Sequence, residues 1–252
     1  MMTQAQKDAI YQIAYENLLR LHANVYPGRF IAMGNSEDGN SIAIIYAIMG
    51  RSDKSRNRIF VEEANGCLKT AQAVPNDEDT SLIIYNAMLE ERGIFFAVSN
   101  GNQTKSAINC INKDGGLNNE MFTDVWKYEP DASNYTSRIT AIYNKEDKKF
   151  QFLLLRKSMF DSNCEKQFYE YSHFNPGYGR CIHTYSGNGD PLPPFTGEPY
   201  LIPLAGNQEE LLNNFWTTLE GENLVSLAVK FIDIVTGESK ILIKNKYEKQ
   251  DE

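Results

Sequence analysis

The alternation of apolar and polar residues along this chain predicts helices in separate groups and strands that come mostly as hairpins. Residues 3–23 place apolar side chains at every third or fourth position, which is typical of an amphipathic helix. Residues 29–34 and 41–49 are apolar, and the polar stretch between them contains Asp38-Gly39, a strong hairpin-turn dipeptide. We therefore expect an N-terminal helix and two antiparallel strands, the second of them buried on both faces.

The rest of the chain continues this arrangement. Asn100-Gly101 ends one apolar run, and residues 144–147 separate two others, so both mark turns. Residues 174–199 are rich in glycine, proline and aromatic residues and predict an ordered loop. Because the strands occur in hairpins and the helices lie apart from them, the pattern favours an α+β fold with antiparallel sheets and helical layers. Further strands are expected over 57–63, 93–99, 138–143, 150–156, 224–234 and 240–245, and further helices over 104–112, 117–127 and 209–219.

The composition excludes several classes of protein. The formal net charge is -8, so the chain offers no general basic face for nucleic acid or for an anionic membrane. No run of about 18 apolar residues is present, and residues 1–25 are polar and periodic. We therefore expect no membrane span and no signal peptide, but a cytoplasmic protein. The four cysteines lie far apart and form no CxxC pair, which argues against a zinc ribbon or a thioredoxin-type motif.

One short segment departs from this acidic composition. Residues 50–58 read Gly-Arg-Ser-Asp-Lys-Ser-Arg-Asn-Arg and place four cations and two serine hydroxyls directly after an apolar strand. Arginine presents a planar fork of N–H donors that matches phosphate in a bidentate manner. The segment therefore predicts a cradle for a small anionic ligand, with a solvated basic loop as the alternative. The usual glycine-rich nucleotide loops, GxxxxGK(S/T) and a helix-opening GxGxxG, are absent.

Six short motifs follow one another between Tyr26 and Ala141. Each is unspecific alone, but their order and their gaps resemble those of the archaeal-type inosine monophosphate (IMP) cyclohydrolase family. The resemblance thins after this range. The motifs are Tyr26-Pro27-Gly28-Arg29, Gly50-Arg51-Ser52 with Asn57-Arg58, Ile84-Tyr85-Asn86, Val98-Ser99-Asn100-Gly101, Tyr128-Glu129 and Tyr135-Thr136-Ser137-Arg138-Ile139.

This resemblance implies a fold and a reaction. The implied fold is a four-layered αββα sandwich similar to N-terminal nucleophile hydrolases, with residues 1–252 as a single domain. Residues 1–24 are then a helical extension before the family's usual start, and residues 160–200 are an insertion loop of a bacterial branch. The implied reaction closes the purine ring of 5-formamidoimidazole-4-carboxamide ribonucleotide to give IMP and water, with no cofactor or metal. The residues that the resemblance assigns to catalysis are Arg58, Tyr85 and Glu129.

Ring closure needs side chains of these types. The 5′-phosphate needs a donor-rich cationic cradle, the oxyanion on the formyl oxygen needs a positioned donor, and the proton transfers need a general base and acid. Glu129 and Tyr85 are the candidates for base and acid. Tyr85, Asn86 or a backbone N–H near Asn100-Gly101 are candidate donors to the oxyanion. The expected substrate-binding residues are Arg29, Arg51, Ser52, Asn86, Asn100, Gly101 and Arg138.

Simpler alternatives exist for single residues. Tyr85 lies in an apolar segment and can be an ordinary core tyrosine. Asn100-Gly101 can be only a turn, and Arg29 and Arg138 can form structural ion pairs.

Two other functions fit the same scaffold. One is a non-catalytic sensor that binds a purine nucleotide. The other is a related amidohydrolase, which needs a nucleophile such as the thiol of Cys67, Cys110 or Cys181. In each case the ligand is a small molecule. We also expect a homo-oligomer, because most soluble assemblies are symmetric and segments rich in aromatic residues and proline often form interfaces.

Overall fold

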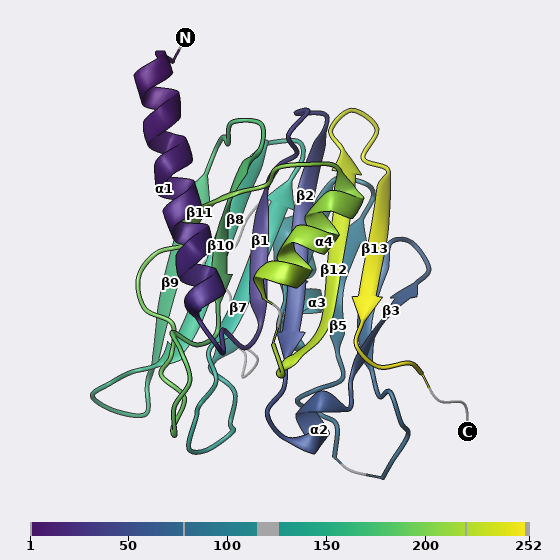
Figure 1. The fold of residues 1–252 in the computed structure, drawn as a ribbon. Coiled ribbons are helices and arrows are strands. Elements are labelled where there is room, and N and C mark those ends of the chain that lie inside the picture. Colours follow the sequence, from purple (N-terminus) through teal and green to yellow (C-terminus); the bar gives the residue numbers. More distant parts are fainter. Residues whose placement is uncertain (1, 78, 115–125, 220, 250–252) are drawn as a thin grey trace.

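Two antiparallel sheets form the body of the protein (Figure 1). The computed structural model describes residues 2–77, 79–114, 126–219 and 221–249. The first sheet has six strands in the order β11-β10-β1-β2-β12-β13. Its strands are β1 (Phe30–Asn35), β2 (Ser41–Met49), β10 (Tyr178–His183), β11 (Tyr200–Pro203), β12 (Leu224–Asp233) and β13 (Ser239–Asn245).

The second sheet has seven strands that follow one another in chain order, from β3 to β9. Each strand pairs with the next one, so the whole sheet is a meander of hairpins. The strands are β3 (Ile59–Glu63), β4 (Cys67–Ala71), β5 (Asn86–Glu91), β6 (Phe95–Ser99), β7 (Arg138–Asn144), β8 (Lys149–Lys157) and β9 (Cys164–Tyr171).

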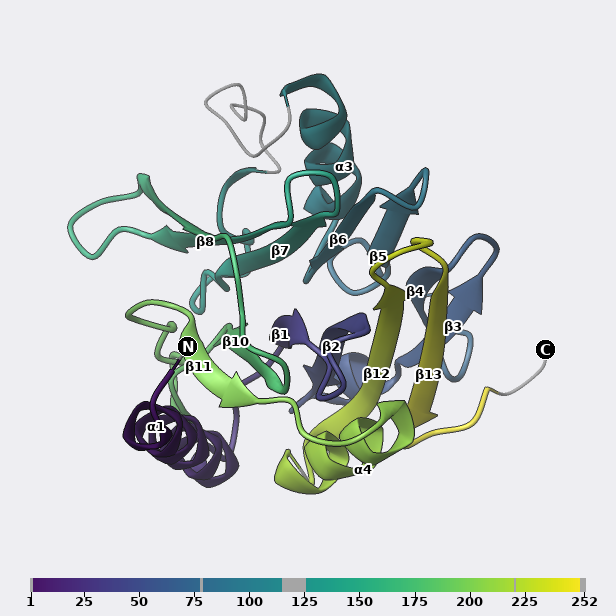
Figure 2. The same cartoon turned by 90° about the horizontal axis from the view of Figure 1, so that it is seen from above.

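Helices cover the outer faces of both sheets, which gives four layers in the order αββα (Figure 2). The helices α1 (Gln4–Ala23) and α4 (Gln208–Thr218) pack on the six-stranded sheet, and α3 (Gln103–Asp114) packs on the seven-stranded sheet. The short helix α2 (Asp53–Arg56) lies outside these layers, in the basic segment after β2. The predicted α+β class is therefore confirmed, while the similarity to N-terminal nucleophile hydrolases stays a prediction.

The main core lies between the two sheets and under α4. Strand β2 is central to it, because eight of its nine residues are buried, as the continuous apolar run predicts. Its neighbours β1 and β12 place Ile31 and Ala228 opposite Tyr46. No helix among the described residues is long and apolar enough to cross a membrane.

The segment 160–200 corrects the expectation of a loop. It contains the edge strand β9 and the inner strand β10, which lies between β1 and β11. Glycines obscure β10 in the sequence, yet Gly179 is required there, since a Cβ atom would lie 2.4 Å from the carbonyl oxygen of Met33. Whether this segment is an insertion relative to the family stays a prediction.

Other differences from the expected elements are smaller. Strands β4 and β11 were not expected, because they are short and their apolar patterns are weak. The basic segment contains α2 in addition to the expected loop. The helix expected over 117–127 falls almost wholly on residues outside the described ranges.

Strand ends bring the predicted site residues to one end of the sandwich. Arg29 precedes β1, and the basic segment follows β2, which is the antiparallel neighbour of β1. In the second sheet, Asn86 begins β5 and Arg138 begins β7, while β6 between them runs in the opposite direction and ends at Ser99. Antiparallel pairing therefore places these five chain positions at the same end of their sheets.

Candidate active site

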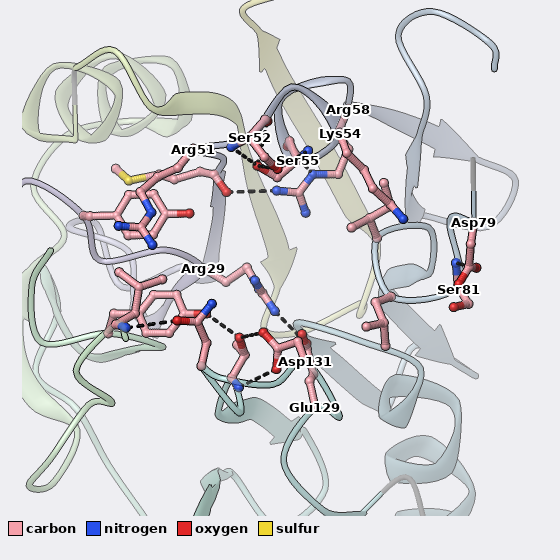
Figure 3. Close-up of a pocket in the computed structure, with 18 residues that line it drawn as sticks. Arg29, Arg51, Ser52, Lys54, Ser55, Arg58, Asp79, Ser81, Glu129 and Asp131 are labelled. Atoms are coloured by element: carbon pink, nitrogen blue, oxygen red, sulfur yellow. Dashed lines mark hydrogen bonds and ion pairs between the residues drawn. The ribbon is translucent and has the colours of Figure 1, made fainter. Parts of the chain in front are cut away.

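A cavity of about 320 Å³ lies at this end of the sandwich (Figure 3). Its wall combines the basic segment after β2 with the segment before β7 and the chain that follows β10. The residues that line it are Tyr26, Arg29, Met49, Arg51, Ser52, Lys54, Ser55, Arg58, Asp79, Ser81, Leu82, Ile83, Glu129, Asp131, Asn134, Thr136, Tyr185 and Leu192.

A capping box shapes the basic segment. The Ser52 hydroxyl accepts from the backbone N–H of Ser55 at 3.2 Å, and the Ser55 hydroxyl accepts from that of Ser52 at 3.0 Å. The two serines thus begin α2 and hold the chain in a tight turn. Lys54 and Arg58 reach the cavity from this turn, whereas Arg56 bonds to Glu222 at 2.9 Å.

Arg58 is buried and its guanidinium is held by the main chain. Its Nε donates to the carbonyl of Ser55 at 2.7 Å, and its Nη2 donates to that of Met49 at 2.9 Å. A guanidinium carries five N–H donors, so these two bonds fix its plane and leave donors for a bound anion. Burial, with a contribution from the nearby Arg29 cation, lowers the pKa of Arg58, while Tyr85 opposes this shift.

Arg29 and Glu129 form a buried ion pair in the cavity wall. Nη2 of Arg29 lies 2.6 Å from Oε1 of Glu129, and both side chains are largely shielded from solvent. Figure 3 shows the guanidinium groups of Arg29 and Arg58 directed into the same space. A tight turn places Arg29: Gly28 has a φ of +75°, and a Cβ there would lie 2.3 Å from the Thr184 hydroxyl.

The charges of this pair affect both pKa values. Burial lowers the pKa of Arg29, but the charge and hydrogen bond of Glu129 together with the nearby Tyr185 and Tyr85 outweigh it, and the pKa lies well above its ordinary value. Burial raises the pKa of Glu129, although Arg29 opposes this. Arg29 therefore stays cationic, and Glu129 is a carboxylate whose affinity for a proton is increased, as a general base at neutral pH requires.

Five of the ten residues expected in the site line the cavity. They are Arg29, Arg51, Ser52, Arg58 and Glu129. The other five, which lie outside the cavity lining, are Tyr85, Asn86, Asn100, Gly101 and Arg138.

Tyr85 lies behind the lining. Its hydroxyl is 2.7 Å from the hydroxyl of Tyr46, and both side chains are buried. It remains close enough to act electrostatically on Arg29 and Arg58. Tyr85 thus belongs to the layer that supports the two arginines.

Asn100 and Gly101 form a turn that also positions Arg138. The side-chain oxygen of Asn100 accepts from the backbone N–H of Ile139 at 2.7 Å, and its nitrogen donates to the Ser137 carbonyl at 2.9 Å. Arg138 donates to Gln103 at 2.9 Å, and a Cβ at Gly101 would lie 2.4 Å from its guanidinium. The polar groups of Asn100 are therefore used within the protein rather than directed at the cavity.

Asn86 contributes through its backbone. Its carbonyl accepts a hydrogen bond from the Thr104 hydroxyl at 2.6 Å, which ties the start of β5 to α3.

The sequence interpretation missed several lining residues. Lys54 and Ser55 lie inside the basic segment, which the composition already marks. Thr136 lies inside one of the motifs that carry the family resemblance. Asp131 had no such signal. Tyr185 lies beyond the range in which the family's motifs follow one another.

Residues 186–194 border the cavity from the side of β10. Ser186 and Pro193 close this segment through a backbone bond of 2.9 Å, and Tyr185 pairs with Pro194 in an isolated bridge. Leu192 donates to Asn134 at 3.0 Å and lines the cavity.

Cysteine side chains are absent from the described lining of this cavity. None of the four cysteines is among its lining residues, and Cys181 is buried, which raises its pKa far above the ordinary value. No group of three or more His, Cys, Asp or Glu side chains in the described ranges could hold a metal ion. The amidohydrolase alternative therefore finds no thiol nucleophile in this wall.

Comparison with known proteins tests the resemblance directly. A family model described as IMP cyclohydrolase-like protein matches residues 26–238. No curated protein matches the chain. The matched range begins after α1 and contains every residue that lines the cavity. Because the match covers most of the sequence, the chain belongs to the IMP cyclohydrolase-like family.

Proposed function

We propose that this protein closes the purine ring of 5-formamidoimidazole-4-carboxamide ribonucleotide to give IMP and water. The observation that carries the proposal is the buried Arg29–Glu129 pair facing a cation-rich segment across one small cavity. Cations suit a nucleotide phosphate, and a buried carboxylate suits proton transfer. A volume of about 320 Å³ is within the range of small-molecule sites.

The proposed reaction has two stages. First, the carboxamide nitrogen attacks the formyl carbon, a C–N bond forms, the nitrogen loses one proton and the formyl oxygen gains one. Then the hydroxyl leaves as water after gaining a second proton, while the formamide nitrogen loses its proton and a C=N bond forms. The water carries the formyl oxygen and two protons from two nitrogens, so the atoms balance without a co-reactant.

The residues divide between the two ends of the substrate. The basic segment binds the phosphate. The donors are its main-chain N–H groups and the side chains of Arg51, Ser52 and Lys54. Glu129 is the general base, because burial raises its pKa. Arg29 and Arg58 stabilise the negative charge that develops on the formyl oxygen, since both guanidinium groups are directed into the cavity.

The residues behind the lining have supporting roles in this proposal. Tyr85 helps to raise the pKa of Arg29 and opposes the lowering of the pKa of Arg58. The Arg138 cation opposes the rise in the pKa of Glu129. The turn at Asn100 and Gly101 holds Arg138, and Asn86 fixes the start of β5. The direct catalytic role that the resemblance gives to Tyr85 stays a prediction.

The test is ring closure by the purified protein. The formylated carboxamide ribonucleotide is mixed with enzyme, and IMP formation is followed by ultraviolet absorbance against a sample without enzyme. We expect rapid closure by the wild type and by Arg56→Lys, and a large loss in Arg58→Lys, because Arg56 bonds to Glu222 and does not line the cavity.

Absence of closure in well-folded wild-type protein, under conditions where an established cyclohydrolase is active, would overturn the proposal. Binding of IMP in that same sample would then indicate the non-catalytic nucleotide sensor.

A further inference from the structure

Three side chains of the cavity wall form a hydrogen-bonded chain that the roles above do not use. The Tyr185 hydroxyl bonds to the Thr136 hydroxyl, and the Thr136 hydroxyl donates to Oδ2 of Asp131. The backbone N–H of Thr136 also donates to Oδ1 of Asp131 at 2.7 Å. All three residues line the cavity; Tyr185 follows β10 of the six-stranded sheet, whereas Thr136 precedes β7 of the seven-stranded sheet.

Counting protons gives this chain a direction. A threonine hydroxyl has one proton, and an ionised carboxylate can only accept. Because Thr136 gives its proton to Asp131, it can only accept from Tyr185. The Tyr185 proton therefore points at Thr136, and the lone pairs of the Tyr185 oxygen remain for a ligand. Tyr185 thus meets the substrate as an acceptor.

The surroundings hold the Tyr185 ring in place and keep the phenol protonated. Its ring stacks on that of Tyr26 with centroids 5.8 Å apart, and the side chain is buried. Burial raises the pKa of Tyr185 to about 12, although the Arg29 cation opposes this shift. The phenol end of the hydrogen-bonded chain is therefore neutral, and the carboxyl group of Asp131 lies at the other end.

We propose that Tyr185 is a further catalytic residue, which accepts a proton from a substrate nitrogen while its own proton passes to Thr136 and that of Thr136 passes to Asp131. This inference rests on the proposed function. The nitrogen becomes acidic as its lone pair forms the new C–N bond, so the transfer coincides with ring closure. Asp131 then holds the proton as a carboxylic acid. The proton returns along the same chain to the formyl oxygen, which becomes a hydroxyl on the closed ring, so the relay ends as it began. Glu129 then takes the proton of the formamide nitrogen as the C=N bond forms and passes it to that hydroxyl, which leaves as water.

Two variants test the relay at different positions. Tyr185→Phe removes the acceptor but keeps the ring stacked on Tyr26, and Thr136→Val interrupts the chain but keeps Tyr185. We expect both to lower kcat by about 100-fold or more, the usual contribution of a general base. The affinity for IMP, measured by calorimetry, should stay within about threefold of the wild type, which is about 0.7 kcal/mol.

Two further variants separate the relay from a structural role. Thr136→Ser keeps the hydroxyl and should retain kcat, even if Thr136→Val folds poorly. Tyr171→Phe is the matched control, because the buried Tyr171 hydroxyl has no partner among the described residues and lies outside the cavity lining. A purely structural clamp predicts instead that IMP affinity and melting temperature fall together with kcat.

The outcomes distinguish this inference from the proposed function. An active wild type whose Tyr185→Phe variant keeps kcat within about threefold overturns the relay alone, since a general base contributes far more than that. An inactive wild type overturns both.

Discussion

Nη1 of Arg51 donates to Oδ1 of Asn188 at 2.8 Å, which joins the basic segment to residues 186–194 at the edge of the cavity. The same nitrogen donates to the Gly189 carbonyl at 2.9 Å, and the guanidinium lies over the ring of Tyr26. These contacts join three separate stretches of chain, around Tyr26, Arg51 and Asn188. Together they hold an otherwise exposed arginine in one orientation beside the cavity, although each surface contact alone is weak.

Replacing Asn188 should weaken binding of the phosphate. In Asn188→Ala the Arg51 side chain gains rotational freedom, which binding must then remove. We expect the Kd of IMP to rise by about fivefold, equivalent to about 1 kcal/mol, and the Kd of inosine, which lacks the phosphate, to stay unchanged. Isothermal titration calorimetry measures both. Asn163→Ala is the control, because the Asn163 side chain donates to Asp161 and lies outside the cavity lining. An equal loss for IMP and inosine would contradict this role.

Arg58 supports the fold as well as the site, so its replacements should differ. Arg58→Ala leaves the buried carbonyl of Met49 and the partly buried carbonyl of Ser55 without their donor, and we expect a loss of about 3 kcal/mol in the free energy of unfolding. Arg58→Lys keeps a cation but loses the planar fork, so it should fold and still lower kcat/KM by about tenfold or more. Urea unfolding and initial rates measure the two effects. If Arg58→Ala has the same free energy of unfolding as Arg56→Ala, Arg58 does not support the fold.

The buried Glu129 predicts a particular pH dependence. Burial raises its pKa above the ordinary value of 4.5, so the carboxylate gains a proton at a higher pH than a typical glutamate. A general base works only when ionised, and kcat/KM should therefore fall as the pH decreases through this raised pKa. Measuring kcat/KM from neutral to acidic pH gives the apparent pKa of this decrease. Glu129→Gln should remove turnover, whereas the exposed Glu209→Gln should leave the profile unchanged. An apparent pKa at or below the ordinary glutamate value of 4.5 would contradict the assignment of Glu129 as the general base.

The fold could be predicted where one pattern dominates. Strand β2 is a continuous apolar run between a turn and a basic segment, and the structure follows that pattern. Strand β10 could not be predicted, because the glycines that suggest a loop serve close packing between strands. Gly34 and Gly179 are opposite each other in the β1–β10 pair, where a side chain on either would meet the neighbouring backbone.

The site could be predicted only where the residue type already carries the chemistry. Arginines in the basic segment and an acid in a family motif indicate charge, and Arg58 and Glu129 do line the cavity. An asparagine beside a glycine does not reveal its partner, and Asn100 uses its side chain on the backbone of Ile139. Tyr185 and Thr136 are separated by 49 residues and adjoin strands of different sheets, so only the fold brings their hydroxyls together.

A buried ion pair between the sheets gives the last prediction. Lys230 on β12 is almost fully buried; it pairs with Glu90 on β5 and donates to the Gly66 carbonyl at 2.8 Å. Lys230→Ala removes one partner and leaves the carboxylate in the interface between the sheets. We expect the free energy of unfolding to fall by about 3 kcal/mol, the lower end for a broken buried pair.

Urea unfolding of three variants tests this expectation. The double variant Lys230→Met with Glu90→Gln removes both charges, so it should recover much of the loss, because a neutral pair carries no uncompensated charge. Lys149→Ala breaks the exposed pair with Glu170 and should cost at most about 1 kcal/mol. If Lys230→Ala costs no more than Lys149→Ala, the pair does not join the two sheets energetically, and the packing of the apolar core between the sheets accounts for their association.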